Sequence, residues 1–156
     1  MFQKPEELIF DHLSQTDETL AIAESLTGGL VSDKITNVSG SSSYFLLGVC
    51  SYANAAKINI LGVKPETIEK FGAVSQECAL EMLKGILKIS GAKWGIATTG
   101  IAGPTGATKT KPIGLVYIAA GTSENYHCEK HIFSGDRLMV KEQSANRALQ
   151  LLSSLF

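Results

Sequence analysis

The sequence lacks a block of basic residues, and this absence argues against nucleic acid as a partner. Its 156 residues carry 14 Lys and Arg against 15 Asp and Glu, a formal net charge of −1. A chain that binds a phosphate backbone concentrates positive charge, which this one does not. Long apolar runs are also missing, since none approaches the roughly 20 residues of a membrane-spanning helix. The first residues do not resemble a signal peptide, so we expect a cytoplasmic protein with no membrane partner.

Cysteine and histidine are scarce, and their spacing favours neither disulfides nor a metal site. Cys50, Cys78 and Cys128 are odd in number and form no C-x-x-C pair. Cys50 falls in a predicted strand and Cys78 in a predicted helix, so we expect both in the core. His127 and His131 share one face of a predicted strand, but no carboxylate or thiol stands at a spacing that completes a ligand set. We therefore predict no metal and no cofactor.

Helical and strand patterns alternate along the chain, whose 44% hydrophobic and 19% charged content is typical of a globular domain. Apolar periodicity, glycines, prolines and caps predict helices over 5–15, 29–36, 54–61, 64–71, 75–91 and from 136 to the end, and strands over 20–24, 45–52, 94–98, 113–120 and 126–133. The turn at 123–125 is too short for a parallel crossover, so the last two strands must be antiparallel. We expect one three-layer α/β/α domain over residues 1–156, with a mixed, mostly parallel sheet of about five strands.

The segment Ser25-Leu26-Thr27-Gly28-Gly29 joins a predicted strand to a predicted helix. Its glycines permit a tight turn and leave backbone N–H groups uncovered at the start of the helix. A nucleophilic serine with an oxyanion hole needs this local geometry. A phosphate-binding loop needs it too, so the segment alone does not distinguish the two.

Two further loops share this richness in glycine and hydroxyl groups, at 39–43 and 98–106. Reactive groups of α/β sheets collect in the loops that follow the strands. The connection over 99–112 is also long, because loops of about a dozen residues are uncommon inside compact domains and tend to be functional. One such loop alone would be interpreted as a tight turn, but three together predict a polar pocket.

Eight short segments, spread over nearly the whole chain, form a combination typical of one protein family. They are E-S-L-T-G-G at 24–29, G-S-S-S-Y-F at 40–45, G-V-C-S-Y-A-N-A-A-K at 48–57, L-G-V at 61–63, G-A-V-S at 72–75, T-G-I-A-G-P-T-G at 99–106, K-P-I-G at 111–114 and G-D-R at 135–137. With these segments the sequence resembles the CinA C-terminal domain family in its stand-alone form. The resemblance implies a nicotinamide-nucleotide amidohydrolase. Such an enzyme converts nicotinamide mononucleotide to nicotinic acid mononucleotide and ammonia in pyridine nucleotide recycling.

The resemblance also implies Ser25 as nucleophile, Lys57 as general base and Tyr52 as a helper that relays or positions the proton. Amide hydrolysis needs a nucleophile, a proton acceptor and donors to the oxyanion. No histidine stands near the glycine-rich loops in sequence. A lysine desolvated in a pocket can have its pKa lowered enough to act as a base, although a lysine taken alone is more often a solvated surface residue. We expect Ser25 Oγ and the Lys57 amine to lie within hydrogen-bonding or one-water reach.

Ten loop residues are candidates for binding the nucleotide. They are Thr27, Gly28, Gly29, Ser42, Ser43, Thr99, Gly100, Gly103, Gly106 and Arg137. The N–H groups of residues 27–29 are placed for an oxyanion or a phosphate, and Ser42 and Ser43 could equally form a simple turn. Arg137, at the start of the last helix, is a candidate phosphate partner or a surface ion pair. Glu24 either supports the site from behind or pairs with a neighbour.

The chain departs from the family pattern at three places. Leu26 replaces a usual Cys, Ala53 and Ala55 replace common Ser and Glu, and the loop at 103–109 lacks the usual run of glycines. The alternative function is therefore a catalytically inactive nucleotide-binding module with a regulatory or competence-associated role. The near-neutral charge argues against a scaffold that contacts DNA. The apolar end at 151–156 makes a homo-oligomer possible.

Overall fold

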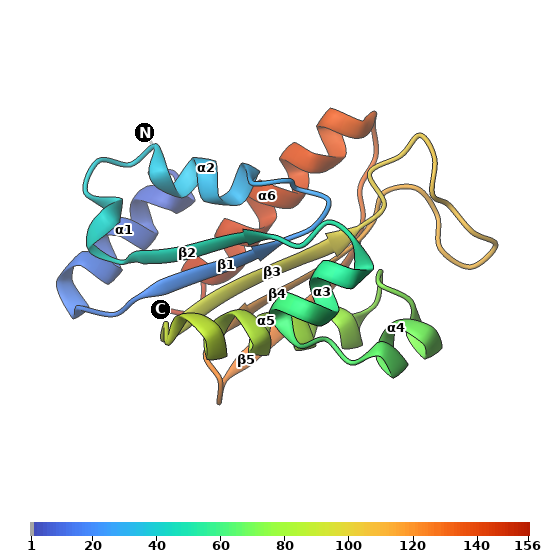
Figure 1. Ribbon diagram of the computed structural model, residues 1–156. Helices are drawn as coiled ribbons and strands as arrows, with labels where there is room; N and C mark the ends of the chain where they lie inside the picture. The colour runs from blue at the N-terminus through green and yellow to red at the C-terminus, as the bar shows by residue number, and fades with distance from the viewer. Residues whose placement is uncertain (1) are drawn as a thin grey trace.

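Five strands form one sheet in the order β2-β1-β3-β4-β5 in the computed structural model, which describes residues 2–156 (Figure 1). The strands are β1 (Leu20–Glu24), β2 (Phe45–Cys50), β3 (Trp94–Gly100), β4 (Leu115–Gly121) and β5 (Tyr126–Ile132). The helices are α1 (Pro5–Thr16), α2 (Leu30–Thr36), α3 (Asn54–Leu61), α4 (Pro65–Phe71), α5 (Gln76–Ser90) and α6 (Arg137–Ser153), with a 3-10 turn η1 (Ser41–Ser43). Among the described residues, no helix combines the length and apolar character needed to cross a bilayer.

The strand directions confirm the predicted mixed, mostly parallel sheet. β1 runs parallel to β2 and to β3, whereas β4 is antiparallel to both of its neighbours, β3 and β5. Four strands therefore point the same way and only β4 is reversed. The loop at 101–114 makes the reversal between β3 and β4, and in Figure 1 it extends beyond the sheet. Because the other strands share a direction, their carboxyl ends meet at one edge of the fold, where loops can form a site.

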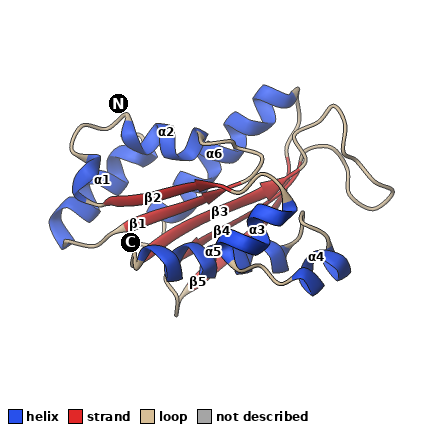
Figure 2. Ribbon diagram, in the orientation of Figure 1, coloured by secondary structure: helices blue, strands red, loops and turns tan. Residues whose placement is uncertain are grey.

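Two apolar clusters, one on each face of the sheet, hold the three layers together. Helices α1, α2 and α6 cover one face of the sheet, and α3, α4 and α5 lie on the other (Figure 2). Successive side chains of a strand point to opposite faces, so Leu20 and Ile22 pack in the first cluster while Ala21 and Ala23 pack in the second. The small alanines of the second face bring α5 close to the sheet, with Met82 fully buried between them.

β2 is an edge strand, and this position corrects one expectation from the sequence. Its side chains alternate between half-buried and exposed, with Leu46 50% exposed, and Cys50 is exposed rather than in the core. The prediction for Cys50 is wrong because an apolar run does not reveal whether a strand has one neighbour or two. Cys78 is buried on α5, as predicted. The strand also ends at Cys50, two residues before the predicted end at Tyr52.

The apolar C-terminal end packs within the molecule. Leu151 and Leu152 are buried, and the Phe156 ring stacks on His12 and meets Trp94 edge-on, with centroids 4.0 and 5.1 Å apart. These contacts use the apolar side chains that suggested self-association from the sequence, so the end of the chain no longer supports a homo-oligomer.

Glu129, on the other edge strand β5, should make stability depend on pH. Arg147 donates two hydrogen bonds to it, of 2.6 and 2.8 Å, and these chiefly lower the pKa of Glu129 to about 2. A lowered carboxyl pKa stabilises the fold above the unfolded-state value, and the gain is lost as pH falls toward 2. Glu129→Gln should therefore cost on the order of 1 kcal/mol at pH 7, since the pair is partly solvated. Urea unfolding should show a smaller difference from wild type at pH 3, and an equal difference would contradict this cause.

Candidate active site

Ser25 follows the carboxyl end of β1 and begins the turn into α2. Its backbone N–H donates to the carbonyl of Thr98 at 3.1 Å, and the Thr27 hydroxyl lies 2.8 Å from the Thr98 hydroxyl. β3 thus holds the turn at two points. The turn closes through Gly28 and Gly29, whose φ angles of +59° and +101° favour glycine. Ser25 is only 7% exposed, so the surrounding residues restrict the position of its hydroxyl.

Lys57 reaches Ser25 from the first turns of α3. Its Nζ lies 2.9 Å from Ser25 Oγ, 2.8 Å from the Ser51 carbonyl oxygen and 3.1 Å from the Tyr52 carbonyl oxygen. The side chain is 2% exposed, and this burial lowers the pKa of Lys57 below its ordinary value. In the neutral amine, two N–H groups suffice for the two carbonyls, which leaves the lone pair to accept the Ser25 proton. The predicted approach of Ser25 and Lys57 is confirmed.

A cavity of about 290 Å³ opens beside this pair, near the lower end of small-molecule sites. Seven predicted residues line it: Ser25, Tyr52, Lys57, Thr99, Gly100, Gly106 and Arg137. Seven further lining residues were not predicted as ligand contacts: Leu26, Asn54, Ala73, Val74, Ile101, Ala102 and Thr105. The Thr99 hydroxyl donates to the Ala73 carbonyl at 2.8 Å, which joins the segment before α5 to β3. Ala73 and Val74 belong to the G-A-V-S segment at 72–75, so this segment was the sequence signal that could have indicated them as lining residues.

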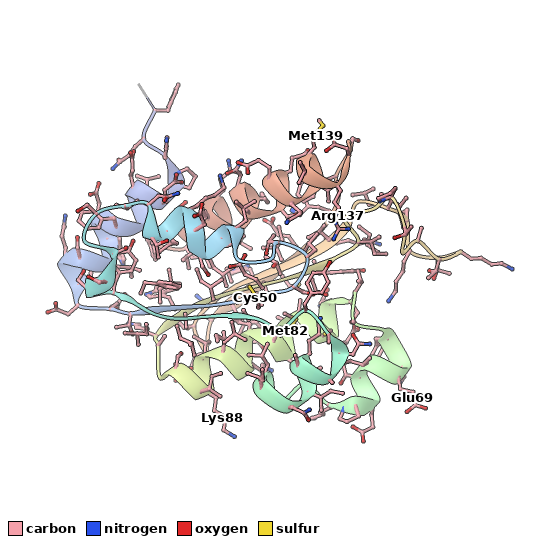
Figure 3. The ribbon with its side chains drawn as sticks, turned by 45° about the horizontal axis from the view of Figure 1, so that its top comes forward. Cys50, Glu69, Met82, Lys88, Arg137 and Met139 are labelled. Atoms are coloured by element: carbon pink, nitrogen blue, oxygen red, sulfur yellow. The ribbon has the colours of Figure 1, made fainter. Side chains whose placement is uncertain are left out.

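Tyr52 and Arg137 together border the mouth of the cavity. The Arg137 guanidinium donates to the Tyr52 hydroxyl and to the Gly103 carbonyl, both at 2.8 Å. Figure 3 shows Arg137 at the start of α6, close to the loop that follows β3. The Tyr52 phenol therefore contacts Arg137 and not Ser25 or Lys57, whereas its backbone carbonyl helps to hold Lys57. Gly103 itself does not line the cavity, and its carbonyl oxygen only helps to hold the Arg137 guanidinium in place.

The structure does not bring Ser42 and Ser43 to this cavity. They form η1 at the amino end of β2, and Ser43 donates to Gly40 within the same turn. Ser25 follows the opposite end of the parallel neighbour β1, about 16 Å away along five residues of strand. Their position corrects the prediction, because only loops at the carboxyl ends of these strands can share the pocket.

Thr27, Gly28 and Gly29 border a separate hollow, together with Lys141 of α6. The Gly28 N–H already donates to the Ser25 carbonyl at 3.0 Å, so it is not free for an oxyanion. The N–H groups of Leu26, Thr27 and Gly29 make no hydrogen bond with another described residue, and of these three residues only Leu26 lines the cavity that holds Ser25. The Leu26 N–H is therefore the candidate oxyanion donor.

Glu24 supports α2 rather than the cavity. Its buried carboxylate accepts hydrogen bonds from the Val31 N–H at 2.9 Å, the Ser32 N–H at 3.0 Å and the Ser32 hydroxyl at 2.7 Å. Negative charge at the start of a helix is favourable. Within residues 2–156, no three His, Cys, Asp or Glu side chains gather as metal ligands.

Nearly the whole of this chain is similar to one part of several longer proteins. The "Putative competence-damage inducible protein" of Thermoanaerobacter pseudethanolicus is 48% identical over 150 residues, covering 96% of this chain and 36% of that protein. The "CinA-like protein" of Kosmotoga olearia is 46% identical over 147 residues, covering 94% and 36%. The chain thus spans 36% of the length of these curated relatives.

Solved structures match over the whole fold, and a family model identifies the domain. The competence/damage inducible protein CihA of Agrobacterium tumefaciens is 36% identical with a TM-score of 0.93, and 99% of each chain is covered. The competence damage-inducible protein A of Klebsiella pneumoniae is 32% identical with a TM-score of 0.92, covering 97% of this chain and 96% of that one. The model of the CinA C-terminal domain matches residues 2–156. The chain belongs to the CinA C-terminal domain family.

Proposed function

We propose that this protein hydrolyses the carboxamide of nicotinamide mononucleotide to nicotinic acid mononucleotide and ammonia. The observation that carries the proposal is the 2.9 Å contact between Ser25 Oγ and the buried Lys57 Nζ at the wall of a small-molecule cavity. A hydroxyl beside a desolvated amine is an activated nucleophile. The substrate comes from the family resemblance, and a cavity of this size fits a ring with a sugar phosphate at its mouth.

The first half of the reaction forms an acyl-enzyme. Lys57 Nζ accepts the Ser25 proton as Oγ attacks the carboxamide carbon, and the Leu26 N–H stabilises the oxyanion of the tetrahedral intermediate. The intermediate collapses with cleavage of the carbon–nitrogen bond, and Lys57 returns the proton to the leaving nitrogen. Ammonia departs, and the nicotinoyl group remains on Ser25 as an ester.

The second half releases the acid. A water molecule attacks the ester carbon while Lys57 accepts its proton, and the bond to Ser25 Oγ then breaks. Oγ takes the proton back from Lys57, which regenerates the neutral amine and frees nicotinic acid mononucleotide. Lys57 therefore acts as base and then as acid in each half of the reaction, because it returns each proton that it has accepted.

Product analysis tests this proposal. Purified protein incubated with nicotinamide mononucleotide should release ammonia and nicotinic acid mononucleotide in equal amounts, measured by an enzymatic ammonia assay and by chromatography. Free nicotinamide as the product would mean cleavage of the glycosidic bond instead. Either that result or the absence of ammonia would overturn the assignment.

Arg137 should determine the preference for a phosphorylated substrate. Losing a charge-assisted bond to phosphate should lower kcat/KM for nicotinamide mononucleotide about 10- to 100-fold in Arg137→Met. The value for nicotinamide riboside, which lacks the phosphate, should change little. Tyr52→Phe is the matched control, because it removes the phenol that Arg137 contacts and keeps the guanidinium. Equal losses on both substrates would show that Arg137 acts only by holding the mouth of the cavity.

A further inference from the structure

The Lys57 amine is buried without a counter-ion. Its hydrogen-bond partners, the Ser25 hydroxyl and the backbone carbonyls of Ser51 and Tyr52, are all uncharged, and its side chain is 2% exposed. The described residues that line the cavity include no Asp, Glu or His, and the other basic side chain among them is Arg137. A buried ammonium without an opposite charge is unfavourable, so these surroundings favour the neutral amine.

The titratable side chains of the neighbouring elements do not supply the missing charge. On α5, the Cys78 thiol interacts electrostatically with the Lys57 amine, but burial raises the pKa of Cys78 to about 11 and keeps the thiol neutral. The carboxylates of Glu24 and Glu81 accept hydrogen bonds from α2 and from the start of α4 instead. Lys111, which approaches the same end of α5, is itself a cation. A counter-ion for Lys57 therefore has to come from a ligand.

Hydrolysis of a carboxamide changes the group that faces Lys57. Nζ has to reach the leaving nitrogen, because it returns a proton there. Before the reaction that nitrogen carries hydrogens and can donate a hydrogen bond to the lone pair of the neutral amine. In the acid product a carboxylate oxygen stands in the same place, and a carboxylate oxygen only accepts. Two acceptors, the oxygen and the lone pair, then face each other unless a proton lies between them.

We propose that the site holds the carboxylate product as an ion pair with protonated Lys57, so that each molecule of nicotinic acid mononucleotide binds together with one proton from solvent. This inference rests on the proposed amidase function. The carboxylate and the proton each strengthen the binding of the other. Where Lys57 is neutral in the free protein, the Kd of the acid should rise about tenfold for each unit of pH, whereas the Kd of nicotinamide mononucleotide should not change. Inhibition by the product therefore weakens over the pH range in which the reaction reaches its full rate.

Calorimetry counts this proton directly. Ser25→Ala keeps Lys57 and removes the nucleophile, so the acid and the amide can both be titrated into the same protein without hydrolysis. The binding enthalpy is measured in two buffers of different ionisation enthalpy, Tris and Bicine, from about pH 7 to pH 10, a range that extends below the pKa of a solvated lysine. The difference between the buffers gives the number of protons taken up. The maximum uptake should approach about one proton with the acid and stay near zero with the amide, whose phosphate is the same.

Two lysine variants, each made in the Ser25→Ala protein, identify the group that takes up the proton. With Lys57→Met the uptake and the pH dependence of the Kd for the acid should disappear. With Lys88→Met, at an exposed lysine of α5, both should remain. Binding of the acid without proton uptake, equal uptake with both nucleotides, uptake that survives Lys57→Met, or failure of the acid to bind would each overturn the proposal. Proton uptake with the acid, together with no ammonia release by the wild type, would overturn the amidase assignment alone.

Discussion

Ser25→Ala should lower kcat for nicotinamide mononucleotide by roughly 10⁴-fold or more, because the acyl-enzyme cannot form without the hydroxyl. The Kd for the same nucleotide should stay within a few-fold of wild type, since one hydroxyl contributes little to ground-state binding. Steady-state ammonia release measures the rate, and isothermal calorimetry measures the affinity. The fold should persist, because the change leaves the Ser25 backbone N–H bonded to Thr98.

Ser42→Ala is the matched control for this variant. Ser42 lies in η1 at the other end of the sheet and should tolerate the change with full activity. If Ser25→Ala kept more than a tenth of the wild-type rate, Ser25 could not be the nucleophile. A comparable loss in Ser42→Ala would indicate instead that the assay responds to general damage to the fold.

Lys57→Met should lower kcat by about 10²- to 10⁴-fold, the contribution typical of a general base. Methionine fills the buried space without an amine. The double variant with Ser25→Ala should be little slower than either single variant, because the two residues act as one catalytic unit. Lys88→Met, at an exposed lysine of α5, should leave the rate unchanged. Additive losses in the double variant would contradict a shared role.

The pH profile tests the protonation state of Lys57 directly. Only the neutral amine can accept the Ser25 proton, so kcat/KM of the wild type should rise with pH until Lys57 is deprotonated. Burial lowers the pKa of Lys57 below its ordinary 10.5, so this rise should be complete at a lower pH than a solvated lysine would require. In Lys57→Met the rise should disappear from the residual rate, and its persistence would assign the titration to another group.

The order of helices and strands could be predicted from the sequence, whereas the order of strands in the sheet could not. Apolar periodicity marks each element because a helix or strand must cover its own part of the core. The apolar sequence of β2 does not indicate whether the strand pairs with one neighbouring strand or with two. For this reason Cys50 was expected in the core and is exposed. β3 runs to Gly100, two residues past its predicted end, and β4 begins at Leu115 rather than at 113. Pairing between these two strands sets both bounds, and pairing is not a local property of the sequence.

The centre of the candidate site could be predicted, but its walls could not. The glycine turn after β1 places Ser25, and the family resemblance indicates Lys57, which lies 32 positions away and touches it. Ala73 and Val74 reach the cavity through the packing of α5 on the sheet, which no local pattern reveals. Ser42 and Ser43 have suitable chemistry but follow the wrong end of a strand. The role of each residue in catalysis stays a prediction.

One measurement tests the amidase assignment most directly: wild-type protein is titrated with nicotinamide mononucleotide in a calorimeter, and ammonia is then quantified in the same sample. The assignment predicts binding followed by release of one ammonia for each nucleotide converted to nicotinic acid mononucleotide. Wild-type protein that binds the nucleotide tightly and releases no ammonia would contradict it and would leave a regulatory nucleotide-binding module in its place.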